Sequence, residues 1–173
     1  HNQADRALHQ HCQFFWSRVE FSMRTRLSIE GVLLTELRQV SDERGMVLHH
    51  MRSDAPEFTT FGECYLSVMV PGAVKAWKRH QEQTQHLAVP VGRVRFVIYD
   101  DRETSPSLGS LDVVELGRPD DYLRLCIPRG LWYGFSCLSD EPALIANCAD
   151  RPHDPADAEL RSDDDPYFPH RWR

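Results

Sequence analysis

The sequence predicts an all-β domain, built either as a closed barrel or as two packed sheets. From Gly31 onward, short runs rich in β-branched and aromatic residues alternate with turns that contain Pro or Gly, and no helical pattern intervenes. Short strands in this number and at this spacing are typical of barrels and double-sheet folds. We expect strands at residues 32–37, 65–70, 73–77, 87–91, 93–99, 110–116, 122–127 and 143–147.

The strand pattern is clearest at residues 93–99, where Arg93 and Arg95 alternate with Val94 and Phe96. Successive side chains of a strand point to opposite faces, so this strand should have one buried face. Turns between the strands follow from Pro- and Gly-containing clusters at 71–72, 90–92, 105–107, 117–119 and 128–130.

Both ends of the chain differ from this β-rich middle. Apolar residues recur at steps of three and four in residues 4–21, which predicts a short amphipathic helix. We therefore expect residues 1–22 to be a helical N-terminal extension, serving either as a packing arm or as a dimer contact. Residues 23–173 should form a single domain. The charged C-terminal segment 150–165 should lie on the surface. Trp172 is too large and apolar to remain exposed to solvent, so the C-terminus should fold back onto the barrel.

Composition and charge exclude several classes of protein. The chain of 173 residues has a net charge of −6 and no block of Lys and Arg, so it lacks the basic patch that nucleic-acid binding needs. Its apolar runs are shorter than the roughly 20 residues of a membrane-spanning helix, and its first residues do not resemble a signal peptide. The five cysteines are odd in number, widely spaced and without a CxxC pair, which predicts reduced core residues in a cytoplasmic protein. We expect no nucleic-acid or membrane partner.

The stretch between Gly72 and Gly92 resembles the first motif of the cupin superfamily. His80 fills the second His position of that motif, whereas Lys78 stands at its first His and Gln85 at its Glu. The resemblance implies the cupin jelly roll, a double-stranded β-helix barrel. The N-terminal helix expected from the apolar spacing, and a short C-terminal segment, would be added to it.

The second cupin motif is met by Pro128 and Gly130, with Tyr133 in place of its His. Of the three His and one carboxylate that hold a metal ion in this superfamily, only His80 is then left. A protonated Lys has no lone pair to offer, and Tyr and neutral Gln are poor ligands for such metals. We expect no metal ion and no other cofactor.

A closer resemblance, spread over most of residues 31–172, is to the dTDP-4-dehydrorhamnose 3,5-epimerase family, a metal-free branch of the cupins. Residues 42–45 (DERG) are similar to the family's D-x-R-G, and 127–135 (IPRGLWYGF) to its I-P-x-G-x-x-H-G-F. Residues 99–109 (YDDRETSPSLG) and 165–172 (DPYFPHRW) match two further segments in the same order. Each match is short, and their shared order indicates common fold and ancestry.

The resemblance implies proton transfer at carbons next to a keto group. Such chemistry needs a base near the proton and a group that stabilises the enolate oxygen. The family is understood to use a His–Asp pair as base, a Tyr on the opposite face as acid, and a Lys at the enolate. Here Asp165 matches the Asp, but Lys78 stands at the His, Ala146 at the Tyr and Gln85 at the Lys.

Positions implied to hold the substrate are retained in part. Arg44 and Lys75 stand where the family places phosphate-binding cations, while Glu63 and Tyr65 replace a Gln and an Asn. A carboxylate at Glu63 would repel a diphosphate unless it paired with Lys75. For Arg44, a turn pair with Asp42 is an equally good interpretation.

Aromatic and amide side chains complete the candidate substrate contacts. Trp77 and Trp132, with Tyr133 and Phe135, are suited to stack on a flat ligand or to pack in the core. Gln85 is the remaining candidate for substrate binding.

Two functions stay open from the sequence. In the first, the chain is an isomerase of a keto-sugar nucleotide such as a dTDP-sugar, or of a related carbonyl compound. Lys78, desolvated inside the barrel, acts as base, His80 supports it from the same strand face, and Tyr133 acts as acid.

In the second function, the barrel only binds a small molecule, or helps a cyclisation in natural-product biosynthesis. Lys78 then forms a structural salt bridge with Asp165. In either case we expect a homodimer, because members of this group commonly resemble strand-exchanged homodimers and exposed barrel edges favour pairing.

Overall fold

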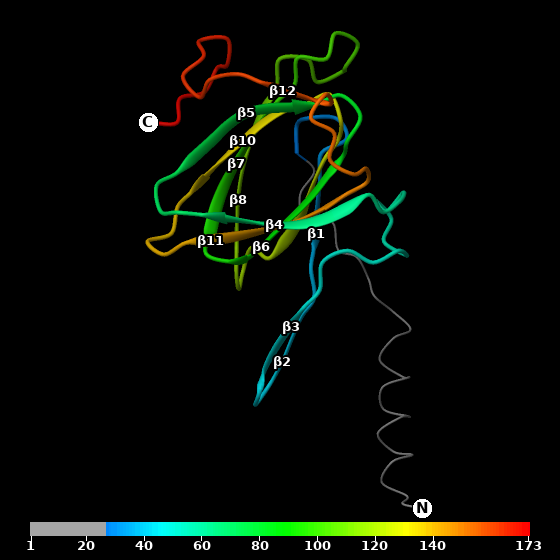
Figure 1. Ribbon diagram of the computed structural model, residues 1–173, viewed down its shortest axis with the longest axis vertical. Coiled ribbons are helices and arrows are strands. Elements are labelled where there is room, and N and C mark those ends of the chain that lie inside the picture. The colour runs from blue at the N-terminus through cyan, green and yellow to red at the C-terminus, as the bar shows by residue number, and fades with distance from the viewer. Residues whose placement is uncertain (1–26) are drawn as a thin grey trace, which may run out of the picture.

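The computed structural model describes residues 27–173, and every regular element among them is a β-strand (Figure 1). The all-β prediction is therefore confirmed, whereas the helix expected in residues 1–22 lies outside the described residues. Within the described part, no helix is long and apolar enough to cross a membrane.

Two antiparallel sheets form a β-sandwich that is consistent with the cupin jelly roll. The first sheet has the order β1 (Leu33–Glu36), β9 (Leu123–Ile127), β6 (Gln85–Val91), β11 (Ala143–Ala149) and β4 (Glu63–Met69). The second has the order β12 (Ala158–Leu160), β5 (Val74–His80), β10 (Trp132–Cys137), β7 (Arg93–Tyr99) and β8 (Leu111–Gly117). A separate hairpin, β2 (Gln39–Asp42) with β3 (Gly45–Leu48), projects away from the sandwich (Figure 1).

All the predicted strands are present with small shifts at their ends, and four further strands were not predicted. The hairpin strands β2 and β3 are short and mostly exposed, so they lack an alternating apolar pattern. Strand β10 lies inside the segment that resembles the second cupin motif, and β12 has only three residues. What makes β12 a strand is its pairing with β5, which no local pattern encodes.

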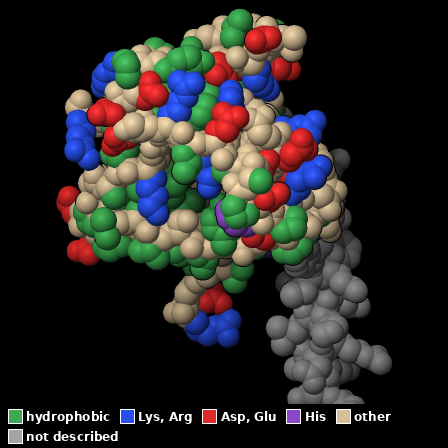
Figure 2. All heavy atoms as spheres, turned by 45° about the horizontal axis from the view of Figure 1, so that its top comes forward, with side chains coloured by type: hydrophobic (Ala, Val, Ile, Leu, Met, Phe, Trp, Pro, Cys, Tyr) green, Lys and Arg blue, Asp and Glu red, His purple; other side chains and the backbone are tan. Residues whose placement is uncertain are grey.

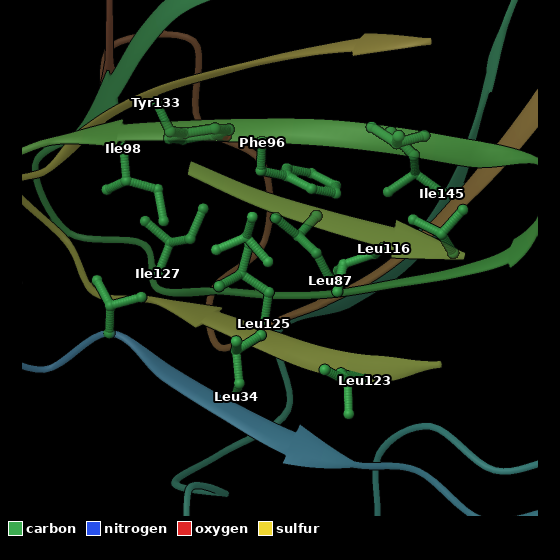
Figure 3. Packing of buried hydrophobic residues seen from close by; sticks show 14 of the residues in the cluster. Leu34, Leu87, Phe96, Ile98, Leu116, Leu123, Leu125, Ile127, Tyr133 and Ile145 are labelled. Carbon is green, nitrogen blue, oxygen red and sulfur yellow. The ribbon is translucent and has the colours of Figure 1, made fainter. Parts of the chain in front are cut away.

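The main core fills the space between the two sheets (Figure 3). Val94, Phe96 and Ile98 of β7 point inward, as the alternation at residues 93–99 predicts. They meet Leu87 of β6 and Leu125 of β9 from the facing sheet. Burying each such side chain contributes about 1.5–3 kcal/mol, so the inner faces of both sheets hold the sandwich together.

A second cluster shows that the C-terminus folds back onto the sandwich, as predicted. Phe168 is buried and stacks on Trp77 of β5 with ring centroids 4.2 Å apart. The ring of Trp172 lies 5.3 Å from that of Trp77. The C-terminal segment therefore covers the outer side of β5 and β10.

The cysteines fit the prediction only in part. The four that the structure describes are free, and Cys126 and Cys137 are buried. Cys64 is exposed, because β4 is an edge strand and the side chain of Cys64 points to the opposite face of that strand from the cavity-lining Tyr65. The expectation that all lie in the core is therefore wrong for Cys64, and Cys12 is outside the described residues.

A register shift between β5 and β10 controls which side chains of β5 face the interior. Tyr133 pairs with Lys78, and two residues later Phe135 pairs with Lys75, so Gly134 opposes two residues instead of one. Such a bulge re-aims side chains locally. A Cβ atom added at Gly134 would collide with the Cβ of Ala76 and lie 2.7 Å from Cζ2 of Trp172.

The bulge requires glycine at this position. We predict that Gly134→Ala lowers the free energy of unfolding by about 1–3 kcal/mol, because overpacking forces backbone shifts. Urea denaturation measures the loss. The matched control is Gly72→Ala, which meets no atom within 4 Å and carries only the cost of its positive φ, about 1 kcal/mol. Equal losses in the two variants would contradict the packing explanation.

Candidate active site

A cavity of about 450 Å³ opens between the two sheets. One wall comes from β5, β10 and β12, and the other from β4, β6 and β11. Trp77, Leu87, Phe135 and Ile145 contribute apolar surface. The polar side chains in the lining are Tyr65, Ser67, Lys75, Lys78, Tyr133, Asn147 and Arg161. Figure 2 shows a hollow in one face of the molecule, with hydrophobic side chains inside it and Lys or Arg side chains beside it.

A chain of hydrogen bonds runs from the cavity into the protein through Tyr133, His80 and Asp157. The Tyr133 hydroxyl lies 3.2 Å from Nε2 of His80, and Nδ1 of His80 lies 3.2 Å from Oδ2 of Asp157. An ionised carboxylate can only accept, so Nδ1 carries the hydrogen and Nε2 accepts from Tyr133. Both His80 and Tyr133 are buried, which fixes this geometry.

The charge states of the three groups suit a proton relay. Burial lowers the pKa of His80, and the nearby charge of Lys78 lowers it further, so the imidazole is neutral near pH 7. Burial raises the pKa of Tyr133, which keeps its hydroxyl protonated. Burial also acts to raise the pKa of Asp157, but hydrogen bonds from the Glu82 backbone and from His80 outweigh it and lower the pKa.

Two lysines of β5 reach the same cavity. Lys78 is half-buried and Lys75 is exposed, and the bulge opposite Gly134 lets both line the cavity although they are three residues apart. Burial lowers the pKa of Lys78, against the opposing influence of Asp157 and Glu63. Its amine is therefore easier to deprotonate than that of an ordinary lysine.

On the opposite wall, a buried chain of amides holds Tyr65. The Tyr65 hydroxyl accepts a hydrogen bond from Nδ2 of Asn147 at 2.9 Å, and Oδ1 of Asn147 accepts from the backbone N–H of His86 at 3.1 Å. The same Asn147 amide also donates to Gln85, which in turn donates to Gln83 at 2.6 Å. Because Tyr65 accepts this bond, its own hydrogen is free to point into the cavity.

Five of the predicted site residues line one cavity, and a sixth lies directly behind it. Lys75, Trp77, Lys78 and Tyr133 share a wall, and Tyr65 faces them. His80 lies behind Tyr133, within hydrogen-bonding distance. The ring of Trp77 belongs to the buried aromatic cluster, where it stacks on Phe168.

Two predicted substrate contacts lie beside the cavity without lining it. Gln85 is buried within the amide chain, where its oxygen accepts from Asn147. Glu63 accepts a hydrogen bond from Gln83 at 3.4 Å. Its charge acts on Lys78, whereas the expected partner was Lys75.

Asp165 does not line the cavity, and the expected salt bridge from Lys78 to Asp165 is not among the contacts of the described residues. Asp165 instead lies 3.7 Å from Arg161 and accepts a hydrogen bond from the backbone of Tyr167. The carboxylate next to the lysine and histidine belongs to Asp157, which the pairing of β12 with β5 carries to His80.

Arg44 and Trp132 are also placed away from the cavity. Arg44 lies at the tip of the β2–β3 hairpin, exposed, with its guanidinium 2.7 Å from Asp42, as in the turn-pair interpretation. Trp132 is buried on the outer side of β10, where its indole N–H donates to Asp101 at 3.0 Å. Trp132 and Tyr133 are neighbours on a strand, so only one of them can face inward.

Three residues of the site were missed in the sequence. Asp157 sits in a charged segment that looks like solvated surface, and Arg161 follows it closely. Asn147 was passed over for its neighbour Ala146, but Asn147 lines the cavity and Ala146 does not. Strand alternation counted from buried Ile145 would have identified Asn147.

No group of three or more His, Cys, Asp or Glu side chains in residues 27–173 is arranged to hold a metal ion. The polar groups at the cavity are instead two amines, two phenols, an aliphatic hydroxyl, an amide and a guanidinium. This set suits proton transfer and binding of an anionic ligand.

Comparisons with known proteins agree on one family. The family model for dTDP-4-dehydrorhamnose 3,5-epimerase matches residues 26–173. The probable low-salt glycan biosynthesis epimerase Agl13 of Haloferax volcanii is 39% identical over 122 residues, which span 69% of this chain and 78% of that protein. The spore coat polysaccharide biosynthesis protein SpsL of Bacillus subtilis is 34% identical over 117 residues, spanning 68% of this chain and 77% of that protein.

A solved structure supports the same assignment. The crystal structure of a dTDP sugar isomerase from Desulfovibrio desulfuricans is 51% identical to this chain and superposes with a TM-score of 0.84. The superposition covers 86% of this chain and 94% of that one. The resemblance inferred from four short segments is thereby confirmed.

The pairing of His80 can be tested directly. We predict that Asp157→Asn lowers the pKa of His80 further, because the hydrogen bond and charge of Asp157 both raise it. An NMR titration of the histidine ring protons measures the shift. Asp165→Asn is the matched control and should leave the pKa of His80 unchanged. A shift in the control variant alone would contradict the pairing of His80 with Asp157.

Proposed function

The chain belongs to the dTDP-4-dehydrorhamnose 3,5-epimerase family, and from this premise we propose that it is an isomerase of a dTDP-linked keto sugar. The proposed reaction moves a proton at a carbon next to the keto group. It needs a proton acceptor on one face of the sugar, a donor on the other, and a group that acts on the carbonyl.

One observation carries this proposal: Lys78 and Tyr133 lie side by side on one wall of the cavity, and Tyr133 is hydrogen-bonded to the His80–Asp157 pair. Tyr133 can take a proton from the sugar while its own hydrogen moves to His80. Lys78 acts on the carbonyl, and Tyr65 on the facing wall can return a proton from the other side. The residues differ from those the family resemblance implies, but the division of roles is kept.

Basic side chains at the cavity support binding of the nucleotide part. Lys75 and Arg161 line the cavity with Lys78, and an anionic diphosphate is attracted by such a group of cations. The carboxylate of Glu63 does not line the cavity, since it is turned toward Gln83.

The first test combines binding with isotope exchange. We predict that dTDP and a dTDP-4-keto-6-deoxyhexose raise the melting temperature, and that the protein exchanges hydrogen next to the keto group with deuterium from heavy water. Tyr133→Phe should lower the exchange rate by about 100-fold or more, a typical contribution of general acid–base catalysis. Mass spectrometry of the recovered sugar measures the exchange.

The control for this test is Tyr99→Phe, which removes a hydroxyl outside the cavity and should leave the rate unchanged. Absence of any stabilisation by dTDP or the sugar would contradict a sugar-nucleotide ligand. Stabilisation without exchange would favour the alternative function, a barrel that binds a small molecule without isomerising it.

We further propose that the protein works as a homodimer in the cytoplasm. The hairpin β2–β3 extends away from its own sandwich and carries Arg44 with it, which suits contact with a second chain (Figure 1). Leu66 and Val68 on edge strand β4, and Val70 just beyond it, are 62%, 65% and 63% exposed. An exposed row of apolar side chains of this kind is typical of a protein–protein interface. Free thiols at four described cysteines suit a reducing compartment.

Light scattering coupled to gel filtration tests the dimer. We predict a dimer for the wild type, and a monomer with unchanged melting temperature for the double variant Leu66→Asp, Val68→Asp, because charges on this row oppose its burial. Val113→Asp is the control, since Val113 is 48% exposed on β8 at an edge of the other sheet. A wild-type monomer, or a dimer that survives the double variant, would refute this interface.

A further inference from the structure

The use of lysine in this chain is restricted to the cavity. The sequence has 20 Lys and Arg residues, and Lys75 and Lys78 are the only lysines among them. Every other basic position of this kind is an arginine, whose guanidinium stays protonated in proteins. Both side chains that can lose a proton and act as an amine nucleophile therefore line one cavity.

The surroundings of Lys78 separate it from Lys75. Lys75 is exposed, as expected for a cation at the opening, whereas Lys78 is half-buried beside the buried Tyr133. Within residues 27–173, no hydrogen bond or ion pair engages the Lys78 amine, although Asp157 and Glu63 act on it through their charges. A half-buried amine without a direct partner is kept available for a ligand.

We propose that Lys78 forms a covalent imine with the keto group of the substrate, and that this imine is what activates the neighbouring carbon. The proposal rests on the proposed function for its substrate class, a compound with a reactive ketone. It goes beyond that function because it replaces electrostatic stabilisation of an enolate with covalent catalysis. Lysines in desolvated pockets are suited to this chemistry.

The reaction balances without any oxidant or reductant. The neutral amine of Lys78 attacks the carbonyl carbon, a C–N bond forms, and the carbonyl oxygen leaves as water with both amine hydrogens. The imine takes one proton from solvent and becomes an iminium ion, which acidifies the adjacent C–H bond. That proton passes to the Tyr133 oxygen while the Tyr133 hydrogen moves to Nε2 of His80, and the C–H electron pair forms the enamine.

The second half of the reaction runs in reverse. A proton returns to the carbon and the iminium ion forms again. If Tyr133 gives the proton, His80 passes its own back to Tyr133; if Tyr65 on the opposite wall gives it, Tyr65 takes a proton from solvent and His80 releases one to solvent. Water then adds to the iminium carbon, the C–N bond breaks, the ketone and the free amine are restored, and the proton taken from solvent in the first half returns to solvent. Because the new carbonyl oxygen comes from water, each cycle replaces the oxygen of the keto group.

Reductive trapping tests the proposal. The full chain is incubated with a dTDP-4-keto-6-deoxyhexose and sodium cyanoborohydride, and its intact mass is measured. We expect a gain equal to the mass of the sugar nucleotide minus one oxygen atom, with the modification mapped by peptide sequencing to Lys78. The site of modification can be assigned without ambiguity, because only Lys75, Lys78 and the chain terminus carry primary amines.

Two matched variants complete the test. Lys78→Arg keeps the positive charge but cannot form an imine, and it should lose the adduct. Lys75→Arg should keep the adduct on Lys78 at saturating sugar nucleotide. Without the reductant, wild type in water labelled with heavy oxygen should transfer the label into the keto group faster than Lys78→Arg does.

The outcomes separate this proposal from the proposed function. Deuterium exchange by wild type without an adduct on Lys78 and without oxygen exchange would overturn the imine and leave the isomerase in place. An adduct on Lys75 or the terminus alone would also overturn it. If the wild type neither binds dTDP or the dTDP-keto sugar nor exchanges deuterium into that sugar, the proposed function itself is refuted.

Discussion

The site depends on the irregular pairing of β5 with β10. In a regular pair, residues three apart on β5 would point to opposite sides of the sheet, and one of the two lysines would face away from the cavity. Because Gly134 opposes two residues, Lys75 and Lys78 both line it. The close approach of Ala76 and Trp172 to Gly134 leaves no space for a side chain there. The bulge, the aromatic cluster behind it and the cavity in front of it therefore form one unit.

Burial of polar groups at this unit is balanced by their mutual hydrogen bonds. An unpartnered imidazole or phenol in the interior costs about 1–3 kcal/mol, so His80 and Tyr133 could not be buried singly without loss of stability. Each is the other's partner, and Asp157 completes the chain from a segment that β12 fixes against β5. The C-terminal part of the chain thus contributes both to the stability of the fold and to the charge state of the site.

Family membership and a changed set of site residues are compatible because scaffold and site depend on different residues. The turns and the apolar inner faces define the sandwich, and the family model matches the chain over residues 26–173. The proton-transferring groups can change as long as their replacements meet in the same cavity. Here Lys78 stands where the resemblance implies a histidine, and His80, two residues later, pairs with Asp157.

The sequence by itself determined the all-β class, most strand positions and the family, and it singled out Lys78, His80 and Tyr133 as candidates, because strand alternation and short motifs are local properties. Only the tertiary structure decided which carboxylate meets His80, and that Trp132 and Arg44 lie away from the cavity. Asp157 and Asp165 both sit in a charged tail and look equivalent locally. Pairing between β12 and β5, far apart in sequence, selects Asp157, and such long-range pairing leaves no local pattern to detect.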